Sequence, residues 1–220
     1  MYSYSMFRGI MSKVLIPVWF FGIDAVFYVA ALLIGLATAF FAYRVFALTG
    51  KKQHFYLFMG FTILSIGFLS LTLTSLYIYL MQPVFISIYN TSFDIMDFGF
   101  ILYYIISIVA YGLFIAMYLP EDKRKMPMFS LLPWWYVLFP FFHLVSMLML
   151  AFVIFRSFIN WSQKKTRSGF AVFAAFSGIG LFHLLSFFTL KYAMFYVIAN
   201  IFLIIGFLSL LVVLVRISRR

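Results

Sequence analysis

Cysteine is absent from this 220-residue chain, and only five residues are acidic. Without cysteine the protein has no disulfide, no thiolate metal ligand and no cysteine nucleophile. None of its apolar segments holds a pair of carboxylates, and the chain lacks HExxH, G-x-S-x-G and glycine-rich phosphate-binding motifs. We therefore do not expect an enzyme, and the sequence identifies no cofactor and no metal site.

Long polar stretches are also missing, while 66% of the residues are hydrophobic and only 10% are charged. A soluble domain of this size could not bury so much apolar surface. Several apolar runs exceed the roughly 18 residues that a helix needs to cross a bilayer, and in lipid a helix satisfies its own backbone hydrogen bonds. The composition predicts an integral membrane protein surrounded by the lipid bilayer.

We expect an all-α fold, a polytopic transmembrane helical bundle that forms a single integral-membrane domain over residues 1–220. The six predicted spans cover residues 17–43, 55–81, 98–119, 133–156, 169–190 and 193–215. The formal charge of +11 would suggest nucleic acid in a soluble protein, but here lysine and arginine lie at the ends of apolar runs, where they reach lipid head groups. We expect no nucleic-acid partner, a multi-pass position in the plasma membrane, and either a homo-oligomer or a partner membrane subunit as the protein partner.

Small residues recur at helical spacing in several predicted spans. They are Ala31, Gly35 and Ala39 in the first span, Gly60 and Gly67 in the second, and Ala171 and Ala175 in the fifth. Small side chains let the backbones of neighbouring helices approach closely, so we expect these positions to pack helices together rather than to bind a ligand.

Two stretches of the chain resemble each other, AFFAYRVFALTGKK at residues 39–52 and AFVIFRSFINWSQKK at residues 151–165. Any basic, aromatic helix end looks similar, so the likeness fits either an internal repeat or two independent helix ends. A true repeat of three spans would place the second unit upside down, because three is an odd number. Inverted repeats are frequent in secondary transporters, whose substrate sites lie near the membrane midplane.

A seventh crossing within residues 127–155 is the alternative topology. With six spans and the N-terminus inside, lysine and arginine divide almost evenly between the two sides. With seven spans and the N-terminus outside, only Arg8, Lys13 and Lys191 lie outside, as the positive-inside rule favours. Length and three prolines favour six spans, because two crossings need more residues than this stretch offers.

Ionisable and amide side chains inside apolar runs are the candidate site residues. Asp24, His143 and His183 are ionisable, and Asn200 carries an amide. Such groups are costly in hydrocarbon and usually face the bundle interior or a water-filled path, so these four are candidates for a ligand or ion path. Each could instead be structural, because Asp24 lies near enough to an interface to be hydrated and a lone histidine can simply bond to a neighbouring helix.

These observations support three functional hypotheses. The first is a transporter of a small solute, an ion or a lipid-like molecule with a polar site near the midplane. The second is a non-catalytic membrane sensor or assembly subunit whose spans bind a ligand or partner helices. The third, an intramembrane haem or metal protein, rests on the two histidines alone.

Overall fold

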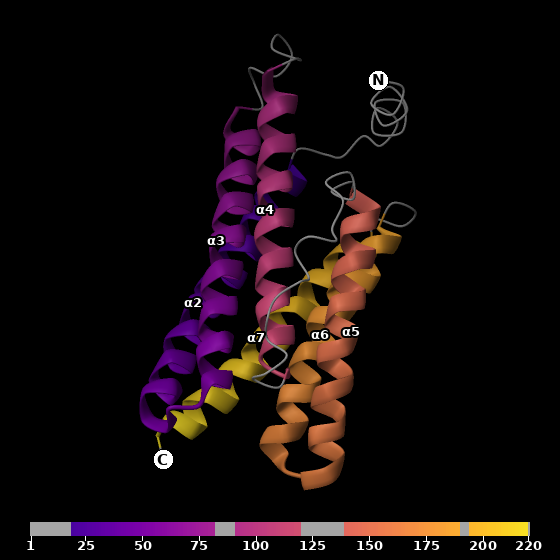
Figure 1. Ribbon diagram of the computed structural model, residues 1–220. Helices are drawn as coiled ribbons and strands as arrows, with labels where there is room; N and C mark the ends of the chain where they lie inside the picture. The colour runs from indigo at the N-terminus through magenta and orange to yellow at the C-terminus, as the bar shows by residue number, and fades with distance from the viewer. Residues whose placement is uncertain (1–18, 82–90, 120–138, 190–193, 220) are drawn as a thin grey trace.

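Six helices account for most of the computed structural model, which describes residues 19–81, 91–119, 139–189 and 194–219 (Figure 1). They are α2 (Trp19–Thr49), α3 (Lys52–Leu80), α4 (Thr91–Ala116), α5 (Phe139–Lys164), α6 (Arg167–Phe188) and α7 (Met194–Ser218). Each contains an apolar segment long enough to cross a membrane, and the described ranges contain no strand. The predicted all-α bundle of six spans is confirmed, and the protein is a multi-pass integral membrane protein.

The helices run past the predicted ends of the spans where a basic residue was taken as the boundary. α2 continues through Arg44 to Thr49, because an arginine side chain can reach the head groups while its backbone stays helical. The helix ends at Gly50, whose φ of 62° is left-handed and whose N–H donates to the Phe46 carbonyl at 2.8 Å. α5 likewise extends to Lys164 and is followed by Lys165, which has a φ of 46°.

Helices that follow each other within each half of the chain are antiparallel. Phe46 near the end of α2 meets Phe55 near the start of α3, with 5.4 Å between ring centroids, and Gly22 at the other end of α2 lies against the Tyr79 ring. The pairs α3 and α4, α5 and α6, and α6 and α7 pack in the same antiparallel way. Short connections between consecutive spans produce this arrangement.

α7 returns beside α2 and runs parallel to it, which closes the bundle. Near the starts of the two helices the hydroxyl oxygens of Tyr28 and Tyr196 are 3.0 Å apart. Further along both helices, a Cβ placed on Gly35 would lie 3.6 Å from the Phe207 ring. Residues that are far apart in the chain thus share one interface in the interior.

α4 and α5 are also parallel, which contradicts the predicted inverted repeat. The Tyr104 ring stacks on Phe142 near the start of α5, with 4.1 Å between centroids, and further along both helices Tyr118 and Ser157 line the same pocket. Both halves therefore run down, up and down as drawn in Figure 1. The prediction assumed that α5 begins at the end where α4 stops, whereas it begins at the opposite end, so the second half is not upside down.

The six described helices start and finish at opposite ends of the bundle, because α2 begins at one end and α7 finishes at the other (Figure 1). The seven-crossing alternative required the lysine pairs at 51–52 and 164–165 to lie at one end, and they do. Of residues 127–155, in which the additional crossing was predicted, those from 139 onward belong to α5 and the others lie outside the described residues. A seventh span therefore stays a prediction.

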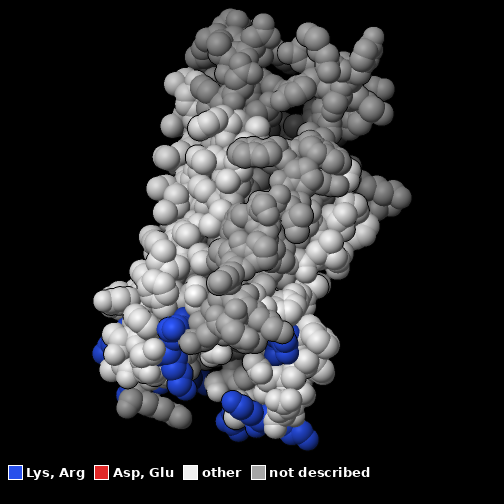
Figure 2. Space-filling view, viewed as in Figure 1, with Lys and Arg blue, Asp and Glu red and all other residues white. Residues whose placement is uncertain are grey.

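Positive charge gathers at one end of the bundle, which we name the basic end. It holds every lysine and arginine of the described ranges: Arg44, Lys51, Lys52, Arg156, Lys164, Lys165, Arg167, Arg216 and Arg219. Figure 2 shows this charge at the lower end and an uncharged surface above it over the parts that are not grey. The lysines and arginines of the described ranges are therefore not divided between the two ends, as six alternating spans would divide them.

The residues predicted to pack helices lie mostly in the interior. Ala31, Gly35, Ala39, Gly60, Gly67 and Ala175 are buried, and Ala171 is half-buried. A side chain at Gly60 would overlap the Phe114 ring. The backbones of α6 and α7 approach closely, because a Cβ on Gly178 would lie 2.9 Å from the Phe202 carbonyl oxygen and one on Gly206 would lie 2.7 Å from that of Ala175.

Candidate functional site

Two groups of buried polar side chains lie in the interior of the bundle. The histidine cluster consists of Tyr111, His143 and His183, from α4, α5 and α6. The aspartate cluster consists of Asp24 and Tyr28 from α2 with Tyr196 and Asn200 from α7. All four polar residues expected to line a path belong to one of these clusters.

The histidine cluster is a hydrogen-bonded series of three side chains. The Nδ1 atoms of His143 and His183 are 3.0 Å apart, and the hydroxyl oxygen of Tyr111 is 2.6 Å from Nε2 of His183. The exposed fraction is 4% for His143 and 0% for the other two. His183 therefore uses both ring nitrogens inside the bundle, one toward each partner.

The series has two directions because a neutral imidazole carries one proton on either nitrogen. In the first, Tyr111 donates to Nε2 of His183, and Nδ1–H of His183 donates to His143. In the second, His143 donates from Nδ1–H, and Nε2–H of His183 donates to the tyrosine oxygen. In both directions each nitrogen of His183 is hydrogen-bonded and the ring is neutral. Switching between the two tautomers therefore moves the ring proton from one nitrogen to the other and reverses the hydrogen bonds along the series.

Aromatic rings surround the two histidines and keep the cluster apolar. Phe142 is 5.5 Å from the His183 ring, and Phe182 is 6.1 Å from the His143 ring, measured between centroids. The described residues contain no group of three or more His, Asp or Glu side chains that could hold a metal ion. A haem iron between the histidines would need two opposed bonds of about 2 Å, so the 3.0 Å between the facing nitrogens does not fit it.

The aspartate cluster is built from two pairs of residues, each separated by one helical turn. Asp24 and Tyr28 lie on one face of α2, and Tyr196 and Asn200 lie on the facing side of α7. The Tyr28 and Tyr196 hydroxyls are hydrogen-bonded at 3.0 Å, and the Asp24 carboxyl is hydrogen-bonded to Tyr196. The Asn200 amide nitrogen donates to the Tyr196 carbonyl oxygen at 3.0 Å.

Two oxygen atoms of this cluster have no hydrogen-bond partner within the described ranges. They are Oδ1 of Asp24 and Oδ1 of Asn200. The exposed fraction is 6% for Asp24 and 1% for Asn200, so neither side chain is freely hydrated. A buried acceptor without a donor lowers the stability of the folded protein, so each of these two oxygens favours the binding of a ligand, a proton or a water molecule.

Tyr103 lies between the two clusters. Its ring is 5.5 Å from Phe68, which stacks on Tyr28, and its hydroxyl interacts electrostatically with those of Tyr28 and Tyr111. The buried hydroxyls of Tyr103 and of Ser107, one turn further along α4, lie near each other, and the Tyr103 hydroxyl also lies near that of Tyr111, but these contacts lack good hydrogen-bond geometry. Polar groups thus extend from the aspartate cluster to the histidine cluster, with the weakest contacts at Tyr103.

An aromatic layer separates the histidine cluster from the basic end. It consists of Phe61 (α3), Phe114 (α4), Phe176 (α6) and Phe207 (α7), all of them fully buried. The Phe61 ring is 5.1 Å from both Phe114 and Phe207, and Phe114 is 5.5 Å from Phe176. α4 runs toward the basic end, so this layer follows Tyr111 by about one turn.

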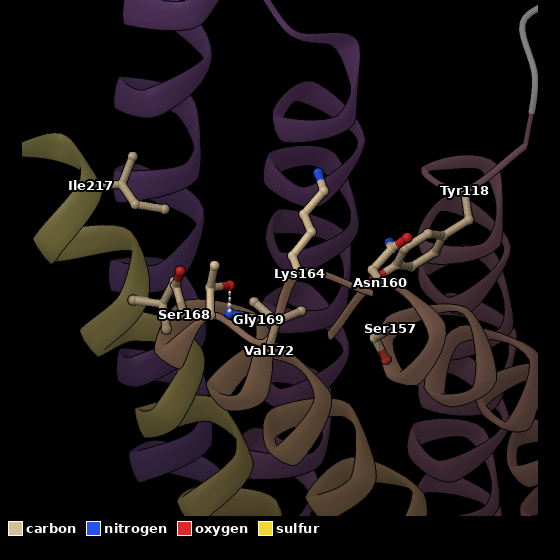
Figure 3. Close-up of a pocket in the computed structure, with 10 residues that line it drawn as sticks. Tyr118, Ser157, Asn160, Lys164, Ser168, Gly169, Val172 and Ile217 are labelled. Carbon is tan, nitrogen blue, oxygen red and sulfur yellow. Dashed lines mark hydrogen bonds between the residues drawn. The ribbon is translucent and has the colours of Figure 1, made fainter. Parts of the chain in front are cut away.

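A pocket of about 250 Å³ opens at the basic end, between the ends of α4, α5 and α7 and the start of α6 (Figure 3). It is lined by Tyr118, Ser157, Asn160, Lys164, Thr166, Ser168, Gly169, Val172, Val213 and Ile217. The N–H of Gly169 is already satisfied by Thr166, which caps α6 at 3.1 Å. The aromatic layer lies between this pocket and the buried clusters.

The four predicted site residues fall into two places rather than one. His143 and His183 are in contact, and Asp24 and Asn200 share the aspartate cluster. The three tyrosines that complete the clusters were missed, because tyrosine is also typical of membrane interfaces. The four-residue spacing between Asp24 and Tyr28 places both on one face of a helix, so this pattern in the sequence could have identified Tyr28.

Three features of the molecule bear on its function: the two buried clusters, their distance from the basic end, and the six apolar helices. No protein-family model, curated protein or solved structure matches the chain.

Proposed function

We propose that this integral membrane protein transports protons, with the histidine and aspartate clusters as successive proton-binding groups. The observation that carries the proposal is the hydrogen-bonded series from Tyr111 through His183 to His143. Ionisable groups in the interior of a membrane bundle are typical of proton relays. The series can accept a proton at one end and release one at the other by a change of tautomer.

The aspartate cluster supplies the entrance of the proposed path. Along α2, Asp24 lies about 30 Å from Arg44, which is about the thickness of the hydrocarbon core. Asp24 therefore lies near the membrane surface opposite the basic end. A proton taken up there would pass through the hydroxyls of Tyr196 and Tyr28.

The weakest part of this path is at Tyr103. Its hydroxyl and that of Ser107 have unused hydrogen-bonding capacity, so a small rotation of Tyr103 toward Tyr111, with a water molecule between Tyr103 and Tyr28, would complete the path. Beyond the histidines, Ser146 on α5 is buried with a hydroxyl that has no hydrogen-bond partner among the described residues, but the four rings of the aromatic layer carry no polar atom. We expect these rings to move when a proton passes to the basic end, which would make the transport gated rather than a permanently open channel.

Proton flux into liposomes tests the proposal. Purified protein is reconstituted with a trapped pH-sensitive dye, and a potassium gradient with valinomycin sets the membrane potential. We expect flux with the wild type and none above protein-free liposomes with His183→Phe or Asp24→Asn. Ser209→Ala is the matched control, because this half-buried serine donates to its own helix, at 2.8 Å from the Ile205 carbonyl oxygen, and lies outside both clusters.

Equal flux in the wild type and in both cluster variants would reject the proposed path. Size-exclusion profiles of all variants show whether a loss of flux follows from misfolding instead. Tyr111→Phe provides a milder change, because it keeps the ring and removes only the hydroxyl that meets His183.

A membrane sensor is the second candidate function, and the aromatic layer favours it. If the layer stays closed, a proton or ligand bound in the clusters could act on the basic end only through the positions of the helices. The wild type would then show no flux. A cysteine introduced by Asn160→Cys in the pocket would instead change its labelling rate when the external pH is lowered.

A further inference from the structure

We infer that the aspartate cluster is a binding site for one monovalent metal cation of the sodium class. The inference deepens the proposed function, because it names a second cation that would share Asp24 with the proton. It does not depend on flux, since a cation can bind to a protein that transports nothing. Both tests can therefore fail separately.

The first argument is the orientation of the two free oxygens. Oδ1 of Asp24 and Oδ1 of Asn200 are acceptors without a donor, on side chains that are more than nine-tenths buried. The Asn200 amide cannot simply be turned over, because its nitrogen already donates to the Tyr196 carbonyl oxygen at 3.0 Å. Exchanging the two amide atoms would place oxygen against oxygen.

The second argument is the kind of atom that the side chains around Tyr196 supply. The Tyr196 hydroxyl interacts with the side chains of Asp24, Tyr28 and Asn200. The cluster therefore offers a carboxylate, an amide oxygen and two hydroxyl oxygens, with no nitrogen or sulfur ligand from these side chains. Oxygen-only sets suit hard cations, whereas imidazole and thiolate ligands select transition metals.

The third argument is charge. Asp24 makes no salt bridge to the described lysines and arginines, all of which lie toward the basic end. A buried, ionised carboxylate without a positively charged partner is strongly unfavourable, and Asp24 has none among the described residues, so we infer that a proton or a cation fills the site. With one carboxylate, a single positive charge makes the site neutral, whereas a divalent ion would leave an excess of charge in the bundle.

Equilibrium binding of radioactive sodium to the purified protein in nanodiscs tests the inference. We expect saturable binding of one ion per protein, displaced by unlabelled sodium and weakened at low pH as protons compete for Asp24. Asp24→Asn should abolish binding, and Tyr196→Phe should weaken it by about 10- to 100-fold, the range typical of groups that support a metal ligand. His183→Phe and Ser209→Ala should bind like the wild type.

A gain of binding guards against variants that simply fail to fold. Asn200→Asp keeps one oxygen and adds a second charge but loses the N–H that meets the Tyr196 carbonyl, so protein of this variant that elutes as folded on size exclusion should bind calcium, which the wild type should not. The inference is overturned if the wild type binds no sodium, or if Asp24→Asn binds it as the wild type does. Sodium binding without proton flux would reject the proposed transport alone, and flux without sodium binding would reject the cation site alone.

Discussion

At the scale of single residues, glycine decides how closely α6 and α7 approach. A Cβ on Gly178 would lie 2.9 Å from the Phe202 carbonyl oxygen and 3.1 Å from the Gly206 Cα. These contacts involve backbone atoms, which cannot swing aside as a flexible side chain can. A methyl group at this position must therefore push the two helices apart.

We predict that Gly178→Ala lowers stability by about 1–3 kcal/mol, the range for overpacking, despite the better helix propensity of alanine. The measurement is the midpoint of thermal unfolding in detergent. Gly22→Ala is the matched control, because the nearest atom to its added methyl is in the Tyr79 ring at 3.2 Å, and Gly22 is only half-buried. Equal midpoints for both variants would contradict the prediction.

Residue type alone could identify Asp24, His143, His183 and Asn200, because a polar group within an apolar run is conspicuous. Their partners could not be identified in this way, since the chain has 15 tyrosines and most positions suit an interfacial ring. The pairs also join residues that are far apart in the chain. Tyr111 and His183 are separated by 72 positions, and Tyr28 and Tyr196 by 168.

At the scale of helices, two turns at the basic end close in a similar way on different residues. After α2 the left-handed residue is Gly50, with a φ of 62°, and after α5 it is Lys165, with a φ of 46°. The N–H of each donates to a carbonyl four residues earlier, at 2.8 and 2.6 Å. Glycine adopts this conformation without strain, whereas lysine does not.

Reciprocal substitutions should therefore have opposite effects. We expect Lys165→Gly to raise the free energy of unfolding by about 0.5–1 kcal/mol and Gly50→Ala to lower it by a similar or greater amount. Unfolding midpoints measured in one detergent give the comparison. Lys164→Gly is the control for the lost charge. Lys164 lies one residue earlier and is still within α5, so this substitution should lower the free energy of unfolding. A stabilised Gly50→Ala protein would refute the account.

The presence of each helix could be predicted from the length of its apolar run, but the residues at which the helices end could not. Arg44 and Arg156 were taken as boundaries, yet both helices continue to the lysine pairs. A basic side chain marks the depth of the head groups rather than the end of the backbone hydrogen bonds. The Gly50 position is the better sequence marker, because it supplies the left-handed residue that stops α2.

At the scale of the whole molecule, the direction of each helix was the least predictable property. Counting apolar runs yields the number of helices but assumes that each connection turns back on the same side. That assumption fails between α4 and α5, which are parallel. Charge was the better guide, because it favoured the alternative in which both lysine pairs share one side.

Single cysteines provide a direct test of this topology, since the natural sequence has none. We predict that Lys51→Cys and Lys164→Cys are both labelled by a membrane-impermeant maleimide from the cytoplasmic side. Met81→Cys, just after α3, should be labelled only from the other side. Labelling of the two lysine positions from opposite sides would restore alternating spans and contradict the arrangement of helices described above.

The concentration of positive charge at one end has a practical consequence for reconstitution. Side chains that carry full charge resist passage through hydrocarbon, so we expect a molecule added to preformed vesicles to enter with the end opposite the basic end leading. The arginines and lysines of the basic end then remain in the external buffer. In a cell where the basic end faces the cytoplasm, as the positive-inside rule favours, such a preparation would be inside-out.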